Sequence, residues 1–168
     1  MTALTLCAAI LLASNSGEFE LYKHQARTAC ATAETIIHES NKAGFDPAVL
    51  AALIFAESRF NKNAVSSAGA CGLTQVIGSY VARTCDELKR PMTSILAGIE
   101  MLERWRSYLQ RTKPDYTMRD LIACYNVGKL CSKSPSARAH AGLVLRAAER
   151  YRSLVTLLHS ERDPSITH

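Results

Sequence analysis

The stretch that decides the fold is Pro47-Ala48-Val49-Leu50-Ala51-Ala52-Leu53-Ile54-Phe55-Ala56-Glu57. Before its last residue it is apolar on every side of a helix, which is typical of a helix buried at the centre of a protein. Asp46 is a good N-cap and Pro47 suits the first helical position, so we expect the helix to begin there and end near Ser58. The rest of the fold should pack around it.

Glu57 is the one charged residue of this stretch. It follows Leu53 by four residues and Ile54 by three, so it shares their buried face. Burial and the negative end of the helix dipole both disfavour its ionised form. A carboxyl group kept protonated in this way is suited to donate a proton to a glycosidic oxygen. The alternative is a helix-end glutamate that turns into solvent or pairs with Arg59.

The remaining sequence also has helical spacing of its apolar residues. The expected helices are residues 18–43, 47–58, 95–109, 117–125 and 134–159, with a short one near residue 73 that is weakened at residue 78. Thr93 or Ser94 is the expected N-cap of the third helix, and Thr117 with Asp120 resembles a capping box. Because all connections are short, we expect one compact all-α domain.

The composition is that of an ordinary globular protein: 168 residues, 48% hydrophobic and 21% charged, enough for one domain with its own core. The net charge of +5 favours anionic partners such as nucleic acid, a membrane surface or bacterial wall polymers. The basic residues are not interleaved with aromatic ones, so we do not expect nucleic acid to be the partner. The arginines of the last helix, Arg138, Arg146, Arg150 and Arg152, more simply form a solvated face.

The first sixteen residues hold the uncharged apolar run 4–13. The run is too short for a stable membrane span. It resembles the apolar part of a signal peptide, with a cleavage zone at residues 13–16, although no basic residue precedes it. We therefore expect residues 1–16 to be a signal peptide or a native helix packed on the domain, and residues 17–160 to be the domain. Residues 161–168 should form a flexible tail.

The six cysteines show no CxxC or Cys/His zinc spacing, so we expect no metal site. Removal of a signal peptide would leave five: Cys30, Cys71, Cys85, Cys124 and Cys131. One or two disulfides are expected in an oxidising compartment, but the sequence does not assign their pairing. The alternative is that several are small buried apolar residues, Cys124 most clearly.

Three motifs occur in order along the chain. Glu57-Ser58 is followed by Ala64-Val65-Ser66-Ser67-Ala68-Gly69-Ala70-Cys71-Gly72-Leu73-Thr74-Gln75 and then by Ala123-Cys124-Tyr125-Asn126-Val127-Gly128. They resemble the soluble lytic transglycosylase (SLT) domain, a relative of goose-type lysozyme, which has Glu-Ser, Ala-x-Ser-x-x-Gly-Ala-x-Gly-Leu-Met-Gln and Ala-Tyr-Asn-Ala-Gly. The resemblance covers about residues 45–152 and implies a lysozyme-like fold. Thr74 stands where the family has Met, which should weaken an apolar wall of the sugar site.

The resemblance implies a role for five residues. Glu57 is the catalytic acid and base, Ser66 hydrogen-bonds substrate, and Gln75 offers its amide to the N-acetyl or hydroxyl groups. Tyr125 helps to hold the Glu57 carboxyl, and Asn126 supports the cleft. Taken singly, each of the last four could instead be a loop, core or turn residue.

The implied activity is cleavage of the β-1,4 bond between MurNAc and GlcNAc in peptidoglycan, with formation of 1,6-anhydro-MurNAc and no metal or cofactor. Asp86 and Glu87 lie in a charged connector and look solvated, so no second acid competes with Glu57. The resemblance also suggests an exported, periplasmic or virion-associated protein that opens the wall for phage entry, conjugation or secretion. The alternatives are a hydrolytic goose-type lysozyme, a non-catalytic wall-binding assembly component and, last, a nucleic-acid-binding domain.

Overall fold

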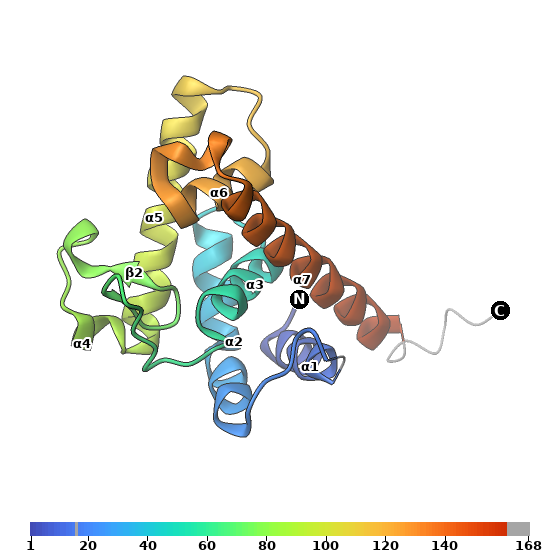
Figure 1. The fold of residues 1–168 in the computed structure, drawn as a ribbon. Coiled ribbons are helices and arrows are strands. Elements are labelled where there is room, and N and C mark those ends of the chain that lie inside the picture. Colours follow the sequence, from blue (N-terminus) through green and yellow to red (C-terminus); the bar gives the residue numbers. More distant parts are fainter. Residues whose placement is uncertain (16, 161–168) are drawn as a thin grey trace.

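Helix α3 (Pro47–Ser58) lies at the centre of the structure, as its apolar sequence predicts (Figure 1). The structure is a computed structural model that describes residues 1–15 and 17–160. All residues from 48 to 55 are buried. The Asp46 side chain caps the helix by accepting from the Ala48 N–H at 2.8 Å, and Pro47 occupies the first turn. Both predicted ends of the helix are confirmed.

The other elements surround α3. They are α1 (Ala3–Ser14), α2 (Lys23–Lys42), β1 (Ala70–Cys71), β2 (Val76–Ile77), the 3-10 helix η1 (Gly78–Tyr80), α4 (Cys85–Leu88), α5 (Pro91–Thr112), α6 (Met118–Val127), the 3-10 helix η2 (Gly128–Lys133) and α7 (Pro135–Ser160). The long helix α7 packs on α3, α6 and α1, and α5 packs on α2 and α6 (Figure 1). The predicted all-α architecture is confirmed, and the expected tail at 161–168 lies outside the described residues.

Helix α1 is part of the hydrophobic core. Leu6, Ala9, Ile10 and Ala13 are at most 1% exposed, and the helix packs against α2 and α7. A disulfide between Cys7 and Cys30 ties it to α2. Among the described residues no helix is both long and apolar enough to cross a membrane. The apolar run 4–13 thus lies within α1, which packs on the domain.

The six cysteines form three disulfides, Cys7–Cys30, Cys71–Cys85 and Cys124–Cys131. The interpretation of Cys124 as a small buried apolar residue was therefore wrong, although its side chain is buried. Cys7 belongs to α1, and without it Cys30 would have no disulfide partner. The disulfides therefore include the N-terminal helix.

The structure differs from the sequence-based prediction near residue 73. The expected short helix is instead a two-stranded hairpin of β1 and β2. Gly72 and Gln75 have positive φ angles of 76° and 49°, and the left-handed backbone cannot continue a right-handed helix. The next long helix begins at Pro91, with Arg90 as N-cap, rather than at Thr93 or Ser94.

One further boundary and one short helix differ from expectation. Helix α2 begins at Lys23 rather than residue 18, because Phe19 turns into the core ahead of the helix. The charged connector contains the four-residue helix α4, which the Thr84 side chain caps by accepting from the Glu87 N–H. The capping box of Thr117 and Asp120 at the start of α6 is confirmed.

Candidate functional site

One cavity of about 750 Å³ collects all five residues that the sequence motifs single out. Glu57, Ser66, Gln75, Tyr125 and Asn126 all line it. They come from the end of α3, the loop and hairpin that follow it, and the end of α6. The volume falls within the range of small-ligand sites. The structure thus brings together side chains that lie up to about 70 residues apart, as 126 − 57 = 69.

The end of α3 is fixed by a sharp reversal of the chain. Arg59 and Phe60 both have positive φ, 50° and 59°, so the backbone turns back directly after Glu57 and Ser58. The Ser58 hydroxyl donates to the backbone oxygen of Leu73 at 2.8 Å. This bond ties the hairpin to the last turn of α3. The Glu57-Ser58 pair therefore places a carboxyl group at the cavity and ties the hairpin to the last turn of α3.

The Glu57 carboxyl contacts a histidine that the sequence motifs do not include. Its Oε1 atom lies 3.1 Å from Nε2 of His140 on α7, and the two side chains are only 13% and 17% exposed. Neither of the two expected alternatives for Glu57 occurs, since its side chain is mostly buried and Arg59 turns elsewhere. The Arg59 guanidinium lies over the Phe55 ring and donates to the backbone oxygen of Glu20.

The spacing of buried residues in α7 could have indicated from the sequence that His140 faces the core. Ala137, Ala141 and Val144 are buried on one face of this helix. His140 follows Ala137 by three residues and precedes Val144 by four, so helical periodicity places it on the same face. A histidine on the buried stripe of a helix packed against α3 is a candidate for contact with a buried acid.

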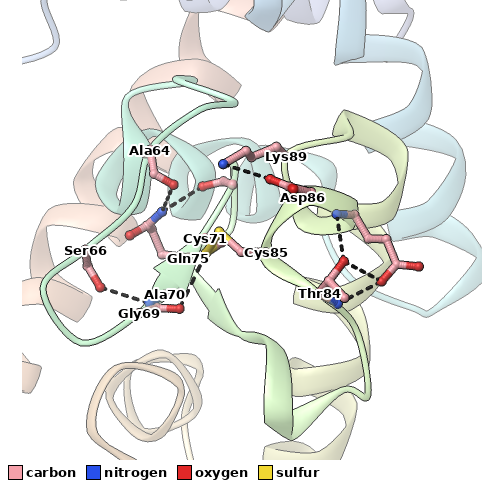
Figure 2. Close-up of a disulfide and its surroundings, with 12 residues drawn as sticks. Ala64, Ser66, Gly69, Ala70, Cys71, Gln75, Thr84, Cys85, Asp86 and Lys89 are labelled. Atoms are coloured by element: carbon pink, nitrogen blue, oxygen red, sulfur yellow. Dashed lines mark hydrogen bonds and ion pairs between the residues drawn. A yellow bond between two sulfur atoms is a disulfide. The ribbon is translucent and has the colours of Figure 1, made fainter.

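The hairpin wall is held by the side chains of Gln75 and Ser66 (Figure 2). The Gln75 amide nitrogen donates to the backbone oxygens of Ala64 at 3.2 Å and Gly72 at 2.9 Å. The Ser66 hydroxyl accepts from the Ala70 N–H at 3.0 Å. The amide protons of Gln75 are thus engaged within the loop, whereas the O–H of Ser66 is not used in these bonds. The Cys71–Cys85 disulfide links strand β1 of this wall to α4 (Figure 2).

Thr74 is directed away from the cavity. It is fully buried, its N–H donates to the Ser94 hydroxyl at 3.1 Å, and its hydroxyl donates to the Ser94 backbone oxygen at 2.7 Å. A Cβ atom on Gly98 would lie 2.6 Å from Thr74 Cγ2, so only glycine allows α5 to come this close. The expectation that Thr74 weakens an apolar wall of the site was wrong. Val76 and Met101 are among the residues that supply that wall.

The α6 wall carries Tyr125 and Asn126. The Tyr125 hydroxyl donates to the backbone oxygen of Thr74 at 2.7 Å. Burial raises the pKa of Tyr125 well above its ordinary value, and the negative charge of Glu57 raises it further. The phenol therefore remains a hydrogen-bond donor at all physiological pH values. The hydroxyl bonds to the hairpin, whereas the charge of Glu57 acts on Tyr125 through space.

The end of α6 brings the chain close to α5. Asn126 is exposed at the cavity rim. Gly128 ends the helix with a φ of 72°, a left-handed conformation that favours glycine. An added Cβ at this position would touch the Trp105 ring at 3.7 Å. The Tyr-Asn-Val-Gly motif thus ends α6 against an aromatic residue of α5, and the Cys124–Cys131 disulfide closes the turn.

Apart from Tyr125, the aromatic side chains of the cavity were not predicted as site residues. Tyr80, Trp105 and Tyr108 line it together with Tyr125. Trp105 and Tyr108 pack edge to face, with ring centroids 5.5 Å apart. The Trp105 Nε1 atom is buried and has no hydrogen-bond partner among the described residues. Trp105 continues the stripe of Ile95, Ile99 and Leu102 along α5, and helical spacing alone does not separate core from cleft at the end of such a stripe.

Comparison with known proteins agrees with this assembly of motifs. The family model described as Transglycosylase SLT domain matches residues 34–142, a span that contains every predicted site residue and His140. No curated protein matches the chain.

Proposed function

Because the chain belongs to the transglycosylase SLT domain family, we propose that it cleaves the β-1,4 bond between MurNAc and GlcNAc in peptidoglycan and leaves a 1,6-anhydro-MurNAc end. The observation that carries this proposal is the position of Glu57. Among the described residues that line the cavity, it is the one carboxylic acid. A reaction that needs a single group to act first as acid and then as base fits this arrangement.

In the first step Glu57, protonated, donates its proton to the glycosidic oxygen. The bond between that oxygen and C1 of MurNAc breaks, and positive charge develops on C1. The N-acetyl group of the same sugar can stabilise this carbon. Glu57 is left as a carboxylate beside the reacting sugar, in a mostly buried position where its electrostatic effect is stronger than in water.

In the second step the Glu57 carboxylate takes the proton of the C6 hydroxyl of MurNAc. The O6 atom then bonds to C1 and closes the anhydro ring. The proton lost in the first step is recovered in the second, so Glu57 returns to its starting state and no water is consumed. No metal or cofactor enters this scheme.

The lining of the cavity supports a sugar ligand. Aromatic rings of Tyr80, Trp105 and Tyr108 offer flat apolar surfaces, while Ser66 and Asn126 offer a hydroxyl and an amide. Ligand sites commonly combine an apolar lining with a few polar groups that fix orientation, and sugar rings present both kinds of surface. We assign Ser66 and Asn126 to substrate binding, and Gln75 to binding through its amide oxygen, since its nitrogen serves the loop.

A hydrolytic lysozyme would use water as the acceptor in place of the C6 hydroxyl. Inverting enzymes require a second carboxylate to activate that water. Asp86 is exposed and pairs with Lys89, and Glu87 accepts hydrogen bonds from Thr84 at the start of α4. Neither lines the cavity. The intramolecular route therefore has more support than the hydrolytic one.

For the biological setting, we propose an exported or virion-associated protein that opens the wall locally for phage entry, conjugation or secretion. Three disulfides support a compartment outside the reducing cytosol. The net charge of +5 suits an anionic wall. Fractionation of cells that express the protein, with free thiols counted in each fraction, tests this setting. Reduced protein confined to the cytosol would contradict it.

The activity is tested by mass spectrometry of the soluble products from purified peptidoglycan. Wild type is compared with Glu57→Gln and with Glu34→Gln, a matched change at an exposed position of α2. We expect anhydro-muropeptides from wild type and Glu34→Gln, and a loss of at least about a hundredfold in Glu57→Gln. Release of reducing ends would identify a lysozyme. Binding of peptidoglycan without any product would favour a wall-binding assembly component.

A further inference from the structure

We infer that His140 is a positioning residue for Glu57: its Nε2–H holds the enclosed carboxyl oxygen, so that the transferable proton is carried by the oxygen facing the cavity. The inference rests on the proposed function of Glu57. It begins from the 3.1 Å contact between His140 Nε2 and Glu57 Oε1. These residues are separated by 83 positions, as 140 − 57 = 83, and lie on α7 and α3, which pack against each other.

The two oxygens of Glu57 have different surroundings. Oε1 is buried and has no aligned hydrogen-bond partner among the described residues. Glu57 lines the cavity, whereas His140 does not. His140 therefore lies behind the carboxyl with respect to the cavity, and Oε2 is the oxygen available to a ligand. A histidine in this position acts on the reaction only through Glu57.

The imidazole nitrogen is also buried, and it too has no aligned partner among the described residues. Leaving two buried polar atoms unpaired is costly, and each is the nearest available partner of the other. The distance of 3.1 Å is already that of a hydrogen bond, so the pair needs alignment but no closer approach. Catalytic hydrogen bonds are often poorly aligned before substrate binds and become shorter in the complex.

The tautomer of His140 then decides where the acid proton lies. With the proton on Nε2, the imidazole donates to Oε1 and favours that oxygen as the carbonyl oxygen, because a carbonyl oxygen accepts better than a hydroxyl oxygen. The proton of a protonated Glu57 is then favoured on Oε2, where a glycosidic oxygen can accept it. When Glu57 becomes a carboxylate, the same N–H stabilises the charge on Oε1. The bond is stronger in the ionised state, so it favours the step that creates the carboxylate.

The kinetic test compares His140→Ala with His140→Gln, in which the amide N–H₂ can replace the Nε2–H donor. We expect His140→Ala to lower kcat by about 10- to 100-fold, the effect of losing a hydrogen bond to a charged group, with KM little changed. His140→Gln should recover most of this loss. The control is His38→Gln, because His38 contacts Glu39 at 2.9 Å on the exposed surface. All variants are checked for thermal unfolding.

A wild-type kcat in His140→Ala would overturn the inference, and so would an equal loss in His140→Ala and His140→Gln when both remain folded. A second measurement does not depend on activity. Long-range ¹H–¹⁵N NMR reports the tautomer of His140, and we expect the proton on Nε2 with a clear shift of that nitrogen in Glu57→Gln. An unprotonated Nε2, or no response to Glu57→Gln, would refute the pairing. If wild type does not cleave peptidoglycan, the proposed function fails and the NMR result alone decides the role of His140.

Discussion

The hydroxyl of Tyr125 donates a hydrogen bond of 2.7 Å to the backbone oxygen of Thr74. This bond joins the two walls of the candidate site, because Tyr125 belongs to α6 and Thr74 to the turn of the hairpin. The same turn is bonded to Ser58 at the end of α3 through Leu73. Glu57 therefore lies between two walls that are connected directly to each other and to its own helix.

Replacing Tyr125 by Phe should loosen this connection. The Thr74 oxygen would be left without its donor, and we expect a loss of about 1–2 kcal/mol in the free energy of unfolding. Because the walls are then less well fixed, we also expect a higher KM for peptidoglycan fragments. Thermal unfolding and steady-state kinetics measure both effects, with the exposed Tyr22→Phe as the control. Unchanged stability and kinetics in Tyr125→Phe would show that the bond has no such role.

The Cys71–Cys85 disulfide should matter for both stability and activity. It closes a loop of 14 residues in sequence separation, for which chain entropy predicts about 2–3 kcal/mol of stabilisation. It also fixes strand β1 of the hairpin wall. We expect the double serine variant to lose stability and kcat/KM. The Cys7–Cys30 pair lies between α1 and α2, so its double serine variant should lose stability and keep its kcat/KM. Equal effects of the two on activity would contradict this separation.

Helix α1 should contribute to folding as a core element. Ile10 is 1% exposed, whereas Leu12 of the same helix is 43% exposed. Truncating a buried isoleucine to alanine costs about 2–5 kcal/mol, and we expect Ile10→Ala to lie in this range. Leu12→Ala should cost less than about 1 kcal/mol. Urea unfolding compares the two variants, and a silent Ile10→Ala would mean that α1 is not packed as described.

Asp120 should make stability depend on pH in the acid range. Burial would raise the pKa of Asp120, but the Thr117 N–H and hydroxyl and the Lys113 ammonium lower it from 3.8 to about 2. A lowered folded-state pKa stabilises the protein above the unfolded pKa, and this contribution disappears as the pH falls through the folded one. We expect Asp120→Asn to lose about 1–2 kcal/mol at neutral pH, and the difference from wild type to vanish between about pH 4 and pH 2.

The control for this experiment is Asp115→Asn, a change at a nearby exposed aspartate. Its unfolding free energy should follow that of wild type over the whole pH range. A gap between Asp120→Asn and wild type that stays constant down to pH 2 would instead assign the loss to packing rather than to the charge of Asp120.

Elements with strong local signals could be predicted from the sequence. Helix α3 was found from its apolar residues and its Asp46-Pro47 start, and α6 from its capping box. The hairpin was missed because its turn depends on positive φ at Gln75, a residue with no special preference for that conformation. Ser94 was expected to cap a helix, but tertiary packing buries it against Thr74 instead.

The candidate site was predicted to the extent that its residues belong to ordered motifs. Glu57, Ser66, Gln75, Tyr125 and Asn126 all reach one cavity. His140 was missed because its contact with Glu57 arises from the packing of two helices that are distant in sequence. Trp105 was missed because one helical stripe of α5 continues from the core into the cleft.

The central claim is that one carboxyl group closes an anhydro ring without the use of water. The most direct test is digestion of purified peptidoglycan by wild-type protein in water labelled with heavy oxygen, followed by mass spectrometry of the muropeptides. The account predicts anhydro-MurNAc ends that carry no label. New reducing MurNAc ends that appear only with active enzyme would contradict it, because they form when water attacks C1.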